Sequence, residues 1–227
     1  MAILHNEIVL QYLILCEGKD TEQFIISYLN SKSLKKDKRF STLIQTFDFG
    51  GITQLSDFIG NLRNMDGFES VSRLMVIRDA ETDPDNAVRM IQKALKDNHL
   101  PVPKEGNCWS APEEDGISTS FTLMPTCQLP YTAGALENLC WDILKDEKAV
   151  ELKNEAKEFV SHIKQTYNTI TSHEHKARLH TYFSINERFV TMKVGEAVRA
   201  GAFDWESEKL MPLKSLIEEG WSVNAII

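Results

Sequence analysis

The sequence has little of what marks membrane proteins and disulfide-bonded proteins. None of its apolar runs reaches the roughly 20 residues that a membrane-spanning helix needs. Its four cysteines lie far apart and form no Cys-x-x-Cys pair: Cys16, Cys108, Cys127 and Cys140. A zinc site and a disulfide framework are therefore unexpected. We expect a cytoplasmic protein with no membrane partner.

The first residues also lack the features of a secretory signal. The segment MAILHNEIVLQYLILCEGKD contains no basic leader and no cleavage site of small residues. Its apolar part runs directly into the polar residues Glu17 to Asp20. We therefore interpret this segment as a buried strand followed by a turn.

Positive charge is scarce as well. The chain has 25 Lys and Arg against 33 Asp and Glu, which gives a net charge of −8. Broad electrostatic binding to nucleic acid is disfavoured, because such binding depends largely on neutralising phosphates. Clustered acids can nevertheless hold a metal ion that itself contacts phosphate. One basic segment is either a solvated loop or a phosphate contact: Lys32, Lys35, Lys36, Lys38 and Arg39.

Nothing in the sequence divides the chain into parts. There is no internal repeat, no low-complexity tract and no linker rich in Pro or Gly within the 227 residues. We expect a single domain over residues 1–227, with a core at about 7–130 and a helical C-terminal extension at about 133–227. No Walker motif is present, so we do not expect this chain to hydrolyse ATP itself.

Apolar patterning predicts strands that alternate with helices. Predicted strands cover residues 7–16, 41–49, 71–81 and 118–125, and helices with an apolar stripe follow the first three at 20–31, 52–65 and 85–100. Five more helices are predicted at 134–146, 148–168, 173–185, 193–201 and 207–219. The fold class is therefore α/β and Rossmann-like, with a mainly parallel central sheet of about four strands between helices and a helical C-terminal part.

Acidic residues gather at the ends of two predicted strands. Glu17 follows the first strand, and Asp79, Glu81 and Asp83 follow the third. Ligands bind beyond the carboxyl ends of strands in open parallel sheets, and acids packed there repel one another unless a cation lies between them. Mg²⁺ or Mn²⁺ suits such hard oxygen ligands. The alternatives are a solvated turn, a cap at Asp83 and a helix-start acid at Glu17.

These motifs resemble the Toprim domain of topoisomerases, bacterial primases and the overcoming-lysogenisation-defect nucleases. Toprim domains carry an invariant Glu in a first motif and Asp-x-Asp in a second. By this resemblance Glu17 corresponds to the Glu, and Asp79 and Glu81 correspond to the two Asp residues. The chain departs from the pattern because it has Glu at position 81 and lacks the Gly that often follows. The resemblance implies a Toprim-like fold with Mg²⁺ chemistry on nucleic acid.

A small stand-alone Toprim family is more similar still, over about residues 8–220. It carries Leu-Glu in a helix after the core and a later Lys-Ala-x-Leu-His segment, which appear here as Leu136-Glu137 and Lys176 to His180. The resemblance implies that Glu137 is a further metal ligand or a general base. It also implies that Lys176 or Lys19 offsets charge in the transition state. Each of these residues has an alternative interpretation as ordinary surface charge.

Together these features predict a metal-dependent nuclease. Asp79 and Glu81 would hold Mg²⁺, and Glu17 would complete the site or act as a general base. By family analogy the substrate is DNA or RNA, in phage defence or RNA processing beside a partner ATPase. Two alternatives stay open: a non-catalytic regulatory module that binds metal or nucleic acid, and a phosphatase or nucleotidyl transferase for small nucleotides. Assembly into a homo-oligomer stays open too.

Overall fold

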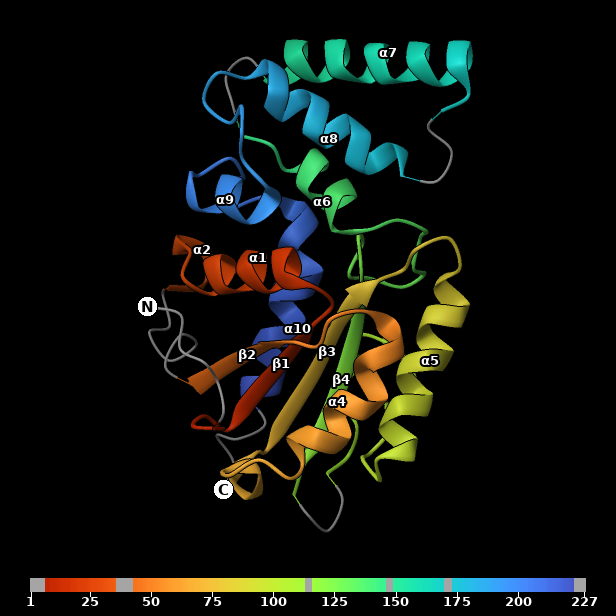
Figure 1. Ribbon diagram of the computed structural model, residues 1–227. Coiled ribbons are helices and arrows are strands. Elements are labelled where there is room, and N and C mark those ends of the chain that lie inside the picture. The colour runs from red at the N-terminus through yellow and green to blue at the C-terminus, as the bar shows by residue number, and fades with distance from the viewer. Residues whose placement is uncertain (1–6, 36–42, 113–115, 146–148, 170–172, 223–227) are drawn as a thin grey trace.

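The centre of the protein is a parallel sheet. The computed structural model describes residues 7–35, 43–112, 116–145, 149–169 and 173–222. In these residues four parallel strands stand in the order β2-β1-β3-β4 (Figure 1). They are β1 (Tyr12–Cys16), β2 (Ile44–Asp48), β3 (Arg73–Asp79) and β4 (Ser118–Met124). The predicted α/β class and sheet are confirmed, although each strand is shorter than the apolar run that predicted it.

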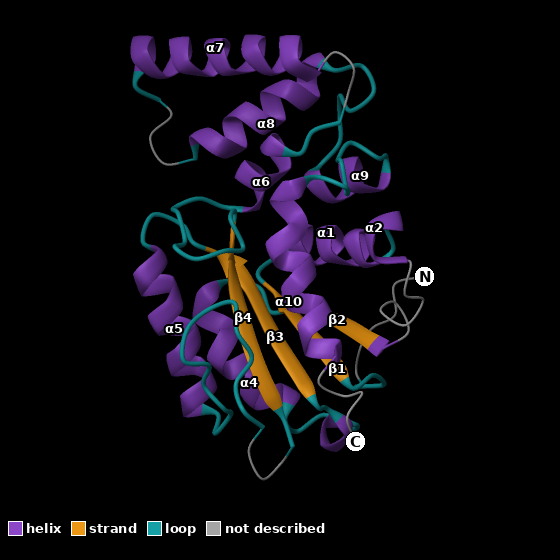
Figure 2. Cartoon of the chain, turned by 180° about the vertical axis from the view of Figure 1, so that it is seen from behind, coloured by secondary structure: helices purple, strands orange, loops and turns teal. Residues whose placement is uncertain are grey.

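Helices cover both faces of the sheet. On one face lie α4 (Leu55–Leu62) and α5 (Pro84–Asp97), with the short 3₁₀ turns η1 (Ile52–Gln54) and η2 (Phe68–Ser70) in the connections. The other face is covered by α1 (Lys19–Leu29) and α10 (Met211–Ser222). Figure 2 shows α10 lying across the strands on that face.

Strand alternation assigns side chains to two separate cores. Leu13, Leu15 and Val76 point toward α4 and α5. Ile14 and Ile77 point toward α1 and α10. Because successive side chains of a strand point to opposite faces, a strand buried on both sides reads as a continuous apolar run. This is why the strand within residues 7–16 carries no polar alternation.

The helical C-terminal part lies beyond the carboxyl ends of the strands (Figures 1 and 2). It comprises α6 (Leu136–Asp142), α7 (Ala149–Tyr167), α8 (Glu174–Ile185), α9 (Val194–Arg199) and η3 (Glu208–Leu210). All five predicted C-terminal helices are present with shifted ends, and the one predicted at 207–219 corresponds to η3 followed by α10. Helices α6 and α8 pack on each other at the edge where the acidic residues were predicted. This part therefore covers that edge of the sheet.

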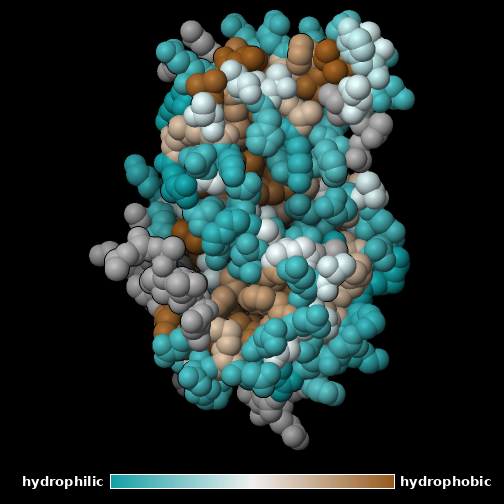
Figure 3. Space-filling model, viewed as in Figure 1, coloured by the Kyte–Doolittle hydropathy of each residue, from teal (hydrophilic) through white to brown (hydrophobic). Residues whose placement is uncertain are grey.

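The basic segment is only partly described. A short helix α2 (Lys32–Lys35) forms its beginning, while Lys36, Lys38 and Arg39 lie outside the described residues. The face seen in Figure 3 is largely hydrophilic, with apolar side chains at the top where α7 and α8 lie. Within the described ranges, no helix combines the length and hydropathy needed to cross a lipid bilayer.

Candidate carboxylate site at the sheet edge

Parallel pairing places the ends of β1 and β3 side by side. Cys16 stands opposite Ile77 in the register, and the Glu17 N–H continues the ladder by donating to the Ile77 carbonyl at 3.0 Å. The Glu17 carboxylate turns toward β3 and accepts a hydrogen bond from the Asp79 N–H at 3.2 Å. The structure therefore brings positions 17 and 79 together, although they are distant in sequence.

A buried arginine anchors the Glu17 carboxylate. The Arg78 side chain is only 4% exposed, and its Nε lies 3.3 Å from Glu17 Oε2. Arg78 Nη1 also donates to the Ala87 carbonyl of α5 at 3.4 Å. Burial raises the pKa of Glu17, while the positive charge of Arg78 and the Asp79 N–H act against that rise. Arg78 thus holds Glu17 in one place at the sheet edge.

Asp79 is the most perturbed acid of the site. Its Oδ1 accepts a hydrogen bond from the Leu136 N–H at 2.9 Å, which joins it to the start of α6. Burial raises the pKa of Asp79 to about 8, helped by the nearby charges of Glu137 and Glu17 and opposed by that hydrogen bond. Glu81 adds a smaller effect of the same direction. Asp79 therefore lies within the fields of three other carboxyl groups.

The backbone fixes Glu81 beside the loop that leads into α6. Glu81 has φ 53°, in the left-handed region, which costs a non-glycine residue about 1 kcal/mol. Its N–H donates to the Gly134 carbonyl at 2.8 Å, and the Gly134 N–H donates back at 2.7 Å. This two-bond bridge closes the 125–135 loop over the end of β3, although the Glu81 side chain itself is exposed.

Helix α8 supplies positive charge opposite the acids. Glu137 is 8% exposed, and Lys176 Nζ lies 3.6 Å from its Oε1. His175 Nε2 lies 4.0 Å from Glu137 Oε2 and has no hydrogen-bond partner among the described residues. Burial lowers the pKa of His175, against the opposing influence of Glu137. The edge is thus walled by β1 and β3 below and by α6 and α8 above.

The carboxylates at this edge are the type of ligand that a hard divalent cation prefers, but their arrangement in the structure is not that of a formed metal site. Carboxylate oxygens are the ligands that Mg²⁺ prefers, and a cation would relieve the repulsion around Asp79. Within the described parts of the chain, however, no three His, Cys, Asp or Glu side chains already stand close enough around one point to hold an ion. Each of Glu17, Asp79 and Glu137 is engaged by a protein donor instead. A metal would have to compete with those donors.

Other predicted residues stand apart from this cluster. Asp83 caps helix α5 by accepting from the Asn86 N–H at 2.9 Å, which is the alternative role considered for it. Lys19 is exposed and pairs with Glu22. Asp20 is the first residue of the helix predicted at 20–31, a position that favours a cap. Helix α1 instead begins after Gly18 without a side-chain cap, and Asp20 accepts from the Gly195 N–H at 3.0 Å. That bond ties α1 to the start of α9.

Sequence reasoning missed two residues of the site. Arg78 lies near the end of an otherwise apolar stretch of predicted strand, and a buried charge needs a partner, so its position was a usable signal. His175 directly precedes the Lys-Ala-x-Leu-His segment and belongs to no motif predicted for the site. No feature of the sequence alone predicts that it faces Glu137.

A known family model matches nearly the whole chain. The family model described as "Protein of unknown function (DUF3226)" matches residues 11–219, which is nearly the whole chain. The chain belongs to the DUF3226 family. The matched residues include every carboxylate of the site as well as His175 and Lys176 of α8. No curated protein matches this chain.

A solved structure shows limited similarity. It is the C-terminal region of the OLD protein of Xanthomonas campestris pv. campestris, phased with iodine. The two chains are 14% identical, with 96% of this chain and 98% of that chain covered, at a TM-score of 0.42. A score of this size does not establish a common fold.

Proposed function

We propose that this DUF3226 protein is a metal-dependent phosphoryl-transfer enzyme that cleaves phosphodiester bonds in nucleic acid. The observation that carries the proposal is the environment of Asp79, a buried carboxyl at a strand end surrounded by the charges of Glu137, Glu17 and Glu81. Such crowding of acids lowers stability and is typical of sites that exist for a ligand. A divalent cation is the ligand that removes the repulsion.

The chain's own residues have distinct roles in this proposal. Asp79, with Glu81 or Glu137 beside it, would hold Mg²⁺ or Mn²⁺, and the ion would supply charge to polarise a phosphoryl oxygen and stabilise the leaving oxygen. Glu17, held by Arg78, would complete the site or accept a proton from an attacking water. Lys176 is the better placed of the two predicted lysines, because its ammonium already faces the acids whereas Lys19 pairs with Glu22. It would offset charge that develops on the phosphate.

One observation favours a second candidate, a regulatory module without turnover. The carboxylates are already engaged by Arg78, Lys176 and backbone N–H groups, so the described residues can satisfy much of their charge without a metal. This module would still bind a divalent ion when the acids are freed. A metal-dependent rise in melting temperature without any cleavage would favour it over the enzyme.

The test is cleavage of labelled single-stranded and double-stranded DNA and RNA in Mg²⁺ or Mn²⁺. Glu17→Gln and Asp79→Asn should each slow cleavage by about a hundredfold or more, because each replaces a carboxyl group that the proposed reaction uses as a base or a metal ligand. Both changes are nearly isosteric, and the amide oxygen that Asp79→Asn introduces can still accept from the Leu136 N–H.

Asp83→Asn is the matched control for this test. It removes one carboxylate from the same turn, yet Asn caps a helix about as well as Asp, so cleavage should stay close to that of the unchanged protein. Equal activity of Glu17→Gln, Asp79→Asn and the unchanged protein would contradict the proposed mechanism. Titration calorimetry with Mn²⁺ would separately show whether Asp79→Asn abolishes metal binding.

A further inference from the structure

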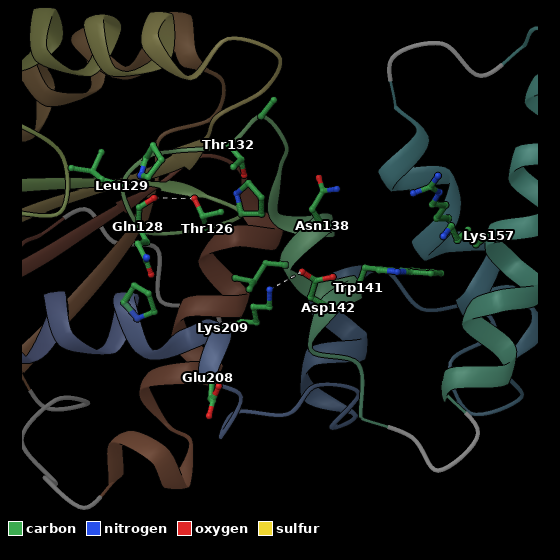
Figure 4. Close-up of a pocket in the computed structure, with 16 residues that line it drawn as sticks. Thr126, Gln128, Leu129, Thr132, Asn138, Trp141, Asp142, Lys157, Glu208 and Lys209 are labelled. Carbon is green, nitrogen blue, oxygen red and sulfur yellow. Dashed lines mark hydrogen bonds and ion pairs between the residues drawn. The ribbon is translucent and has the colours of Figure 1, made fainter.

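A second concave feature adjoins the carboxylate site. It is a hollow of about 660 Å³ between the 125–133 loop, α6, α7, α8 and the start of α10 (Figure 4). This volume lies within the range of about 300–1,000 Å³ that holds organic ligands in proteins. None of the residues predicted for the metal site lines it. The hollow therefore needs an explanation of its own.

Basic side chains reach this hollow from three separate elements. Lys157 comes from α7, Arg178 from α8 and Lys209 from η3. Lys209 Nζ stands 3.9 Å from Asp142 and Arg178 pairs with Glu174, whereas Lys157 is an exposed side chain of the hollow. Two acids, Asp142 and Glu208, also line the hollow, so its charged lining carries a small excess of positive charge. In a chain with net charge −8, that local excess favours an anionic ligand.

A flat aromatic ring lies among these charges. Trp141 lines the hollow and, as Figure 4 shows, extends from α6 toward the helix that carries Lys157. Lys153 Nζ lies 5.3 Å from the centre of the Trp141 ring, and Tyr182 meets that ring edge-on. The lining also includes uncharged donors and acceptors: Thr126, Gln128, Thr132 and Asn138. A ring next to cations and amides is the combination that binds unpaired nucleotides.

Helix α6 connects the hollow to the carboxylates. Glu137 and Trp141 are four residues apart, so they lie on the same side of the helix. At the other end, Ala133 of the hollow precedes Gly134, which is bonded to the backbone of Glu81. A strand of a few nucleotides lying in the hollow would therefore lie against two segments, α6 and the backbone at 133–134, that also contact the carboxylate site.

We propose that the hollow lined by Trp141, Lys157 and Lys209 binds single-stranded nucleic acid, with a base against Trp141 and phosphates at the lysines. Bases present their faces only when they are unpaired, which excludes an intact duplex from this mode. DNA and RNA share this chemistry, so the two are arms of the test. As the substrate class of the enzyme, this inference rests on the proposed function, but the binding itself does not require the metal.

The experiment measures fluorescence anisotropy of labelled oligothymidylate and oligouridylate of about twelve nucleotides, in EDTA, with the full chain. The double variant Lys157→Gln/Lys209→Gln should weaken binding about tenfold or more. It should also flatten the slope of log affinity against log salt by about 1.4, at about 0.7 for each lost phosphate contact. Lys93→Gln/Lys96→Gln on α5 removes the same charge from exposed positions outside the hollow and should leave the affinity unchanged.

Two further readouts address the ring and the substrate class. Oligonucleotide binding should quench tryptophan emission, and Trp141→Phe should remove most of that quenching while the chain stays folded by circular dichroism. A duplex of the same length and a mononucleotide should each bind at least about tenfold more weakly than the strand. The stronger of the DNA and RNA arms identifies the natural strand.

The inference is overturned if the hollow variant and the α5 variant bind equally well, if duplex binds as tightly as single strand, or if no strand binds at low salt. The same holds if the mononucleotide matches the strand, which would indicate a small-nucleotide site. If no strand binds but metal-dependent cleavage is observed, only this inference is contradicted. If a strand binds in EDTA but is not cleaved in Mg²⁺, only the proposed enzymatic function is contradicted.

Discussion

The buried charges at the two ends of strand β3 have opposite kinds of partners. At its start, Arg73 is 4% exposed and donates to neutral carbonyl oxygens, those of Gly220 at 3.2 Å and Ser72 at 2.7 Å. At its end, Arg78 faces the Glu17 carboxylate, and Asp79 lies among three further acids. The first end holds one guanidinium bonded to neutral groups, whereas the second end concentrates charges that repel one another.

This difference distinguishes a buried charge that stabilises the fold from buried charges that, in the proposed function, take part in the reaction. A guanidinium whose N–H groups meet backbone carbonyls ties α10 to the sheet and creates no cluster of acids that needs a cation. Several carboxylates against one arginine leave excess negative charge in a partly buried place, which lowers stability unless something else binds. Substitutions at the two ends should therefore differ in how their effect on stability depends on pH, and in which second substitution restores the lost stability.

The largest effect is expected for Arg78→Met. This change leaves the Glu17 carboxylate without its cation, and breaking a buried ion pair by removing one partner costs about 3 kcal/mol of unfolding free energy. Glu17→Gln added to Arg78→Met should restore much of the loss, since the unpaired charge is then gone. Urea denaturation at neutral pH measures both. Equal losses in the single and the double variant would mean that Arg78 acts through packing alone.

Asp79→Asn should act in the opposite direction. The pKa of Asp79 is about 8 in the folded protein against 3.8 ordinarily, so between these values the folded state keeps a proton that the unfolded chain has lost. Stability of the unchanged protein therefore falls as pH rises through this window, and a side chain that does not titrate removes that fall. We compare the unfolding free energy of the variant with that of the unchanged protein at each pH. This difference should favour the variant by on the order of 2 kcal/mol more at pH 8 than at pH 4.

Thermal unfolding of both proteins across this pH range measures the gain. Asp142→Asn serves as the control, because Asp142 is an exposed acid of the neighbouring helix and its change should leave the pH profile as it was. A gain for Asp79→Asn that is the same at every pH would show that its carboxyl is not held protonated in the folded protein.

Much of this fold could be predicted because local patterns agree with the tertiary structure. The apolar run at residues 12–16 had to be a strand buried on both faces, and the parallel sheet followed from the helices between strands. The approach of Glu17 to Asp79 followed in turn, because parallel strands end at one edge. These predictions need only periodicity and connectivity.

The rest of the site depends on packing that no local pattern encodes. Nothing near His175 or Lys176 in sequence shows that α8 crosses α6 beside Glu137, because that contact is set by how two helices bury their apolar faces. Asp20 illustrates the same limit. Its position fits a cap for α1, yet it accepts from the backbone at the start of the distant helix α9.

The smallest effect is expected at the other end of β3, for Arg73→Met. Burial lowers the pKa of Arg73, but its hydrogen-bond acceptors are neutral, so the change costs about 1–2 kcal/mol for two hydrogen bonds and leaves no unpaired charge. The loss should be the same from pH 5 to pH 8, because no acid of the carboxylate site is affected. The changes in unfolding free energy caused by Arg73→Met and Glu17→Gln should also be additive, since the two residues share no partner in the described structure. A loss that Glu17→Gln relieves would place both ends of the strand in one electrostatic network and remove the distinction between them.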